Sequence, residues 1–194
     1  MSETDILIVR HPETEANVAG RFVGQGESAY TELGRVQARR LPRKLARFQP
    51  EVVWSSPLLR ARVVAERAAR LAGVPLRIDG RLMEMNFGVA ESLTWEELAE
   101  ADIPFNYKSA EQPVAPGGES RNQLDTRVAA VLDEIHSLSG RHVVVCHGGV
   151  MRAALVHVLG LEPEQIWAFS IHNAQMAHVR IVGDHGLLEE YVRG

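Results

Sequence analysis

Two apolar runs constrain the fold of this chain most strongly. Residues 6–9 (Ile-Leu-Ile-Val) are typical of a buried strand, and residues 142–146 are nearly all β-branched, which suits a strand covered on both faces. The first run is followed at once by Arg10 and His11, and the second by His147. In open parallel α/β sheets, ligands bind just outside the carboxyl ends of the strands. We therefore expect a ligand site where these two strands end.

The remaining sequence alternates strand and helix patterns. Strands are expected at 5–9, 51–54, 76–78 and 142–146, followed by an antiparallel edge hairpin of 177–182 and 187–192. Residues 13–30 form a long polar loop, which is a candidate binding loop. Helices are expected to begin at the N-caps Thr31, Ser56, Thr94 and Ser120, and again after His147. Pro57 would take the first helical position after Ser56, Gly73 would end that helix, and Pro42 should kink or split the helix before it.

Composition limits the protein class. The chain has 194 residues, a net charge of −4 and ordinary hydrophobicity, which predicts one domain over 1–194 and gives no support for a nucleic-acid or membrane partner. The Pro- and Gly-rich stretch at about 91–118 differs in character and is interpreted as an inserted lid. The single cysteine, Cys146, cannot form an internal disulfide, and neither a secretory signal nor a spanning apolar run is visible. These features predict a cytoplasmic protein.

Four strand ends carry related chemistry. Arg10 and His11 follow the first strand, and Arg60 lies in the helix after the second. Glu84 follows the third strand, and His147 follows the fourth. The arginines and a protonated His147 would neutralise a phosphate dianion. His11 would attack phosphorus through one ring nitrogen while the other donates to the backbone. Glu84 would protonate the leaving oxygen and then deprotonate the attacking water.

Other interpretations remain open. Taken singly, each of these side chains could be a surface or structural residue, and only their joint placement favours a site. Residues 146–152 also fit the Cys-x₅-Arg loop of cysteine phosphatases, in which helix N–H groups cradle a phosphate. Against that mechanism, Cys146 continues an apolar strand and is expected to be a buried thiol. No histidine pair has the His-Glu-x-x-His spacing, so no metal site is expected.

Five ordered motifs resemble those of the histidine phosphatase superfamily, the phosphoglycerate-mutase-like enzymes. They are the stretch 10–14 (Arg-His-Pro-Glu-Thr) with Asn17, the stretch 56–61, the stretch 82–91 around Glu84, the stretch 116–120 with Arg127, and the stretch 144–149. The resemblance implies an α/β fold of three αβα layers, with a mostly parallel central sheet that has an antiparallel edge. It also implies a phosphohistidine on His11 and neither a metal nor an organic cofactor.

The resemblance further assigns residues to the site. Glu84 would be the proton donor, and the phosphate pocket would be lined by Arg10, Asn17, Arg60 and His147, with Val23, Gly24 and Gly148 as further substrate contacts. Pro12 replaces the usual glycine, which fixes φ, removes one N–H and disfavours a helical conformation at His11. The pose of His11 is therefore the geometry to test.

These observations predict a metal-independent phosphomonoesterase whose partner is a small phosphorylated metabolite. A phosphoglycerate mutase and a non-catalytic phospho-ligand-binding module are the alternatives. The lid has only one basic residue, Lys108, whereas a mutase must hold a second phosphate or carboxylate with extra basic groups, so the phosphatase is favoured. The oligomeric state is left open, with a homodimer among the options.

Overall fold

The sheet at the centre of the protein has six strands in the order β3-β2-β4-β1-β5-β6. The computed structural model describes residues 3–193, and its strands are β1 (Glu3–Arg10), β2 (Val52–Ser55), β3 (Leu76–Ile78), β4 (Gly140–Cys146), β5 (Gln175–Val182) and β6 (His185–Arg193). Strands β1 to β4 pair in parallel, while β5 and β6 add antiparallel at one edge. The predicted mixed sheet and edge hairpin are confirmed.

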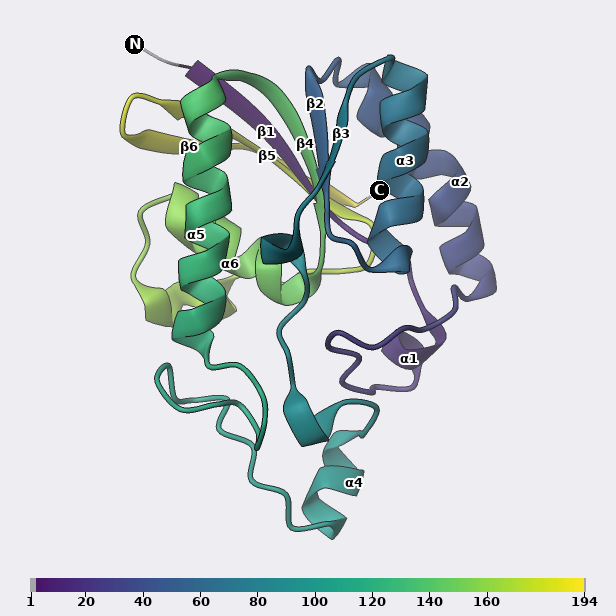
Figure 1. Cartoon of the computed structure of the whole chain (residues 1–194), viewed down its shortest axis with the longest axis vertical. Coiled ribbons are helices and arrows are strands. Elements are labelled where there is room, and N and C mark those ends of the chain that lie inside the picture. Colours follow the sequence, from purple (N-terminus) through teal and green to yellow (C-terminus); the bar gives the residue numbers. More distant parts are fainter. Residues whose placement is uncertain (1–2, 194) are drawn as a thin grey trace.

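Helices cover both faces of this sheet, as Figure 1 shows. On one face lie α2 (Glu32–Arg47) and α3 (Leu59–Ala72), and on the other lie α5 (Arg121–Leu138) and α6 (Gly148–Val158). The short helices α1 (Glu15–Val18) and α4 (Trp95–Glu100) lie beyond the carboxyl ends of the parallel strands, and three 3₁₀ turns complete the chain: η1 (Gly80–Leu82), η2 (Gly88–Ala90) and η3 (Pro163–Ala168). The three-layer αβα architecture is confirmed.

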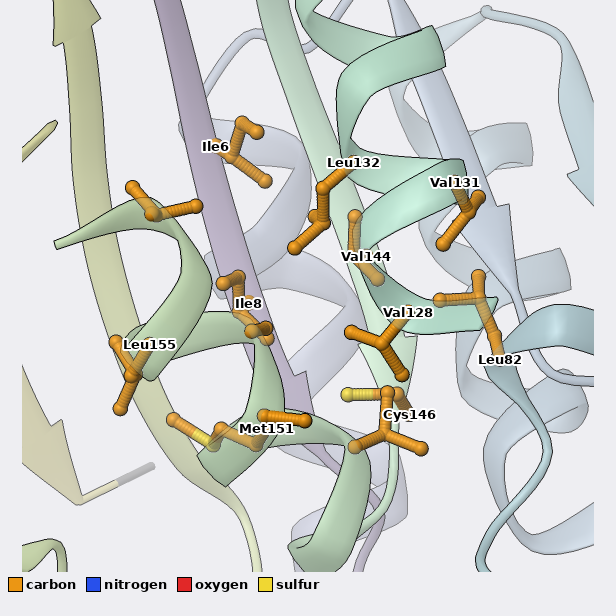
Figure 2. Packing of buried hydrophobic residues seen from close by; sticks show 14 of the residues in the cluster. Ile6, Ile8, Leu82, Val128, Val131, Leu132, Val144, Cys146, Met151 and Leu155 are labelled. Carbon is orange, nitrogen blue, oxygen red and sulfur yellow. The ribbon is translucent and has the colours of Figure 1, made fainter. Parts of the chain in front are cut away.

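Alternation along β1 divides the core into two parts. Ile6 and Ile8 pack in the cluster under α5 and α6, whereas Leu7 and Val9 pack in the cluster under α2 and α3. Successive side chains of a strand point to opposite faces, so a continuous apolar run is what a strand between two helical layers requires. Figure 2 shows Ile6 and Ile8 of β1 facing Leu132 of α5 and Leu155 of α6.

Three helix starts agree with the sequence. The side chains of Thr31, Thr94 and Ser120 each accept a hydrogen bond from the backbone three residues on, as N-caps do. Gly73 ends α3 with φ of 71°, a left-handed conformation that suits glycine. No helix among residues 3–193 is both long and apolar enough to cross a bilayer.

The structure excludes one of the two outcomes expected at Pro42 and corrects the start of the helix after β2. Pro42 does not split α2, which is a single helix from residue 32 to 47 with the proline ring buried. The helix after β2 begins at Leu59 with Leu58 as N-cap, and not at Ser56. Ser56 N–H donates to Val145 O, 3.1 Å away, and so extends the β2–β4 pairing, while the first helical acceptor is Leu58 O, which accepts from Arg62 N at 3.0 Å. The Ser56 hydroxyl is thereby held at the strand end rather than inside the helix.

The segment 91–118 has a small core of its own beyond the sheet. Leu98 and Ala115 are buried there with Ala90, and Phe87, Phe105 and Phe22 pack around them. Phe22 comes from the polar loop after β1, and its ring lies 4.6 Å from the Phe105 ring, centroid to centroid. Phe22 therefore joins the early loop to this segment.

Candidate active site

The strand-end residues predicted from the sequence converge on one cavity. Its volume is about 610 Å³, and it lies where the parallel strands β1, β2 and β4 end. Of the predicted site residues, those that line it are Arg10, His11, Asn17, Val23, Gly24, Arg60, Glu84 and Gly148. His147 lies directly behind them, its ring centroid 5.1 Å from that of His11.

The backbone of His11 is fixed from two sides. Its N–H donates to Cys146 O at 2.9 Å, which continues the β1–β4 pairing, and its carbonyl accepts from Ala174 N at 3.1 Å. The ring is only 3% exposed, and its Nδ1 lies 2.7 Å from Pro12 O. Because a carbonyl can only accept, Nδ1 carries the hydrogen and Nε2 keeps its lone pair. Pro12 therefore supplies the backbone acceptor that the predicted mechanism needs.

Electrostatics keep His11 neutral. Burial, and then the positive charges of Arg10 and Arg60, hold the pKa of His11 well below its ordinary value. A buried imidazole among arginines loses its proton easily, since both surroundings disfavour the cationic form. His11 is thus a free base at neutral pH, which is the protonation state that a nitrogen nucleophile requires.

Asn173 orders the loop beside the nucleophile. Its Nδ2 donates to Asn17 Oδ1 at 2.9 Å and lies 3.4 Å from the carbonyl oxygens of both His11 and Pro12. The same Asn17 oxygen accepts from the backbone and hydroxyl of Thr14. With its oxygen so occupied, Asn17 can offer its amide N–H groups to a ligand. The sequence analysis missed Asn173, which lies in an irregular segment with no motif.

The two arginines near His11 are held by backbone carbonyls. Arg10 Nη1 donates to Ile171 O at 2.9 Å, and the two terminal nitrogens of Arg60 donate to Gly26 O and Gly24 O at 2.6 Å. The Nε atoms of both arginines are buried without a hydrogen-bond partner among the described residues. A buried N–H group without a hydrogen-bond acceptor costs free energy, so these two donors indicate that an anion binds between them and accepts their hydrogen bonds.

His147 differs from its prediction. Burial, and then the positive charges of nearby arginine side chains, lower its pKa well below the ordinary value, which disfavours the protonated ring expected from the sequence. Its Nε2 lies 2.8 Å from Ser56 Oγ, which already accepts from Leu58 N. That arrangement favours a hydroxyl donating to Nε2 and a hydrogen on Nδ1. The Nδ1 atom is buried without a partner among the described residues, so it can donate to an anion as a neutral group.

Glu84 is held by two backbone N–H groups, one from the next residue and one at the start of α6. Its carboxylate accepts from Met85 N at 2.9 Å and from Gly149 N at 3.2 Å. A Cβ on Gly149 would lie 2.5 Å from Glu84 Oε1, whereas a Cβ on Gly148 would meet nothing nearer than 3.5 Å. Gly149 is therefore the glycine of this pair that permits the close approach, whereas Gly148 was the one expected to contact the substrate.

Glycine, basic and aromatic residues complete the lining of the cavity. Gly24 has φ of 53°, and a Cβ there would strike the Glu91 carboxylate, so the loop beside Arg60 requires glycine. Lys108 is the single basic residue of segment 91–118, as the sequence shows, but Arg121 of α5 and Arg152 of α6 also line the cavity. The cavity wall is largely aromatic on the side of segment 91–118, where it is lined by Phe22, Phe87, Trp95, Phe105 and Tyr107. Trp95, Phe105 and Tyr107 stand out in the sequence as lid aromatics that could contact a leaving group or pack the lid, whereas no sequence pattern joins Phe22 and Phe87 to them.

The cysteine alternative is contradicted. Cys146 is fully buried in the core cluster with Ile8, Val128 and Met151, as Figure 2 shows. Burial raises the pKa of its thiol, and only the thiolate is a strong nucleophile. Cys146 also does not line the cavity that holds His11. The thiol is thus a small core side chain.

Comparison with known proteins agrees with this geometry. A sequence model of the histidine phosphatase superfamily (branch 1) matches residues 6–193, so the chain belongs to that superfamily. It is 36% identical over 163 residues to a metal-independent phosphoserine phosphatase of Arabidopsis thaliana, covering 80% of this chain and 68% of the relative.

Two further similarities widen the range of relatives. The chain is 32% identical over 161 residues to a protein of Escherichia coli O1:K1 / APEC named "probable phosphoglycerate mutase GpmB", covering 80% of this chain and 75% of the relative. Its fold matches that of a mycobacterial glucosyl-3-phosphoglycerate phosphatase in complex with VO3, with a TM-score of 0.86 and 26% identity over 98% of this chain and 100% of the other. Relatives thus include proteins named as phosphatases and as mutases.

Proposed function

We propose that this protein is a metal-independent phosphomonoesterase that hydrolyses a small phosphorylated metabolite through a phosphohistidine on His11. The observation that carries the proposal is the set of buried donors around the nucleophile. Arg10 Nε, Arg60 Nε and His147 Nδ1 all lack partners among the described residues and surround a neutral imidazole. Relatives named as metal-independent and glucosyl-3-phosphoglycerate phosphatases support the same chemistry.

The first step transfers the phosphoryl group to the enzyme. His11 Nε2 attacks phosphorus and forms the N–P bond while the ester P–O bond breaks. Glu84, entering this step as the acid, gives its proton to the departing oxygen and becomes a carboxylate. Arg10, Arg60 and His147 donate hydrogen bonds to the phosphoryl oxygens, whose charge they stabilise in the transition state.

The second step returns the enzyme to its starting state. Water attacks the phosphorus of phosphohistidine, and the Glu84 carboxylate takes the proton that the water loses. The N–P bond breaks, inorganic phosphate leaves, and His11 Nε2 regains its lone pair. The hydrogen bond from Nδ1 to Pro12 O holds the ring in one orientation through both steps.

A labelling experiment tests this function. Protein incubated with a ³²P-labelled monoester and quenched in alkali should carry a label that is stable to base and labile to acid. His11→Gln should abolish both label and turnover, whereas Cys146→Ala should retain both. Turnover at the wild-type level in His11→Gln would refute the phosphohistidine mechanism.

A phosphoglycerate mutase is the second candidate, since Arg121 and Arg152 add basic groups to the cavity and one relative carries that name. The discriminating assay incubates the protein with 3-phosphoglycerate and a trace of 2,3-bisphosphoglycerate. Release of inorganic phosphate without appearance of 2-phosphoglycerate supports the phosphatase. Interconversion faster than phosphate release would support the mutase instead.

We also propose a cytoplasmic location, because the only cysteine is a buried thiol that cannot form an internal disulfide. Cell fractionation with a tagged full chain tests it. Recovery outside the cytoplasmic fraction would contradict the proposal.

A further inference from the structure

We propose that Arg127 is a positioning residue, which sets the place of the general acid Glu84 without touching the substrate. The inference rests on the proposed phosphatase reaction, in which Glu84 gives and takes the proton. Arg127 lies in α5, is mostly buried, and does not line the cavity that holds His11 and Glu84. Any effect that it has on the reaction must therefore act through the residues that it contacts.

The guanidinium of Arg127 uses all of its N–H groups. Nη1 donates to Arg81 O at 2.6 Å and to Met83 O at 2.7 Å, and Nη2 donates to Glu84 O at 3.1 Å. Nε and Nη2 also donate to the two carboxylate oxygens of Glu119, at 2.7 and 2.9 Å. Because a guanidinium is planar and carries its N–H groups in a fixed fork, the three carbonyls are bound to one rigid group.

The backbone around Glu84 is not held by a helix or a strand. The turns η1 and η2 lie on either side of it, and residues 83–87 belong to no regular element. Leu82 is fully buried against α5, in the same cluster as Val128, the residue after Arg127 (Figure 2). The carbonyls that follow it accept from Arg127, where a strand would accept from its neighbour. Arg127 therefore supplies the hydrogen bonds that fix this segment on α5.

A second set of contacts fixes the other side of Glu84. The Glu119 carboxylate, which pairs with Arg127, also accepts from Asn86 N at 3.2 Å, and Glu119 N donates to Asn86 O at 2.8 Å. The Glu84 carboxylate itself accepts from Gly149 N of α6 at 3.2 Å. The backbone of the acid is thus held from α5 and its carboxylate from α6. Moving a catalytic group by about 1 Å can lower a rate about a hundredfold, so loss of either support should impair proton transfer.

Two monoesters of similar size test the proposal. The leaving oxygen of phenyl phosphate needs a proton from Glu84, whereas that of para-nitrophenyl phosphate leaves as a stable anion. The ratio of their kcat/KM values in one sample measures how well the acid works, whatever fraction of the sample is folded. Arg127→Lys keeps the charge but not the fork. It should lower kcat/KM roughly ten- to hundredfold for phenyl phosphate and no more than about threefold for para-nitrophenyl phosphate.

Three further variants complete the comparison. Glu84→Gln removes the acid and should give the same pattern with a larger difference between the monoesters. Glu119→Gln weakens the pair that orients Arg127 and should give a smaller difference in the same direction, which keeps the proposal testable if Arg127→Lys does not fold. Arg141→Lys is the matched control, because Arg141 also donates to a backbone carbonyl, Phe48 O at 2.8 Å, but lies at the end of β4 away from the site. It should leave the ratio unchanged.

Equal losses on the two monoesters in Arg127→Lys and Glu119→Gln would overturn the proposal, because they would show a contribution to folding alone. Wild-type activity of both variants on phenyl phosphate would overturn it as well. Failure of the phosphatase assignment would remove the basis of the inference but looks different, since wild-type protein would then release no phosphate from either monoester.

Discussion

The two buried histidines of the site should make the stability of the protein depend on pH. Burial lowers the pKa of both His11 and His147 well below the ordinary value, so the folded protein leaves both rings neutral under mild acid. The unfolded chain protonates them near pH 6.5. Because the unfolded state then binds more protons, the free energy of unfolding falls as the pH falls below that value.

The expected loss in the free energy of unfolding follows from this difference in proton binding between the folded and unfolded states. Between pH 6.5 and 5.5 each histidine that stays neutral in the folded state and titrates at 6.5 in the unfolded chain lowers the free energy of unfolding by about 1 kcal/mol. The pair should therefore contribute about 2 kcal/mol. Urea denaturation in phosphate-free buffer at the two pH values measures the total loss, to which His142 adds because burial lowers its pKa as well. Phosphate is left out because bound phosphate would stabilise the folded state.

One variant and one control isolate the effect. His11→Gln removes one of the two titrating groups, so the loss between pH 6.5 and 5.5 should shrink by about 1 kcal/mol. His185→Gln replaces an exposed ring at the start of β6 and should leave the loss unchanged. An unchanged pH dependence in His11→Gln would refute the conclusion that His11 is kept neutral by its surroundings.

Three further outcomes are expected at the site. Gly149→Ala should fold normally but lower kcat at least tenfold, because the added Cβ displaces the Glu84 carboxylate. Steady-state kinetics measures kcat, and circular dichroism of the same sample checks the fold. Ser56→Ala should lower kcat by roughly tenfold, because His147 loses the hydroxyl that orients it, and a shift of the His147 ring signals in NMR would accompany the loss. A pH profile of kcat/KM should show no loss of activity centred near pH 6.5, because the pKa of His11 is lowered; a loss centred there would contradict a neutral nucleophile.

The chemistry at strand ends was predictable because its signals are local. A buried apolar run marks β1 and β4, and the polar residue that follows each run must lie at the strand end. Once the strands are parallel, Arg10, His11 and His147 have to share one edge of the sheet. Glu84 and Arg60 follow by the same argument. That these residues converge could therefore be predicted from the order of strands and helices along the chain, without any distance between them.

The features that the sequence did not predict correctly depend on tertiary contacts. Ser56 has the sequence signature of an N-cap, but pairing with β4 keeps its backbone in the strand, and its hydroxyl serves His147 instead. Arg152 lies inside a helix and looks like an ordinary surface arginine until α6 is docked on the sheet. Asn173 lies in a segment without a pattern, and its partners Asn17 and His11 are more than 150 residues away in the sequence.

Pro12 replaces the glycine of the family motif, and the geometry around His11 shows that this replacement is compatible with the phosphohistidine chemistry proposed for the site. The interaction that orients the nucleophile uses the Pro12 carbonyl, which proline retains, and the N–H that proline lacks is not part of that interaction. Proline also restricts the unfolded chain, so Pro12→Gly should lower the free energy of unfolding by about 1 kcal/mol, counting chain entropy and some lost burial of the ring.

Catalysis should respond much less to this change. The ring of His11 keeps its carbonyl partner, and its backbone stays bonded to Cys146 and Ala174, so kcat of Pro12→Gly should remain within about threefold of wild type. Steady-state kinetics on one monoester, with urea denaturation of the same samples, separates the two effects. A large gain in kcat in Pro12→Gly would contradict this expectation. It would show that Pro12 holds the His11 ring away from its reactive position and that glycine lets the ring return to it.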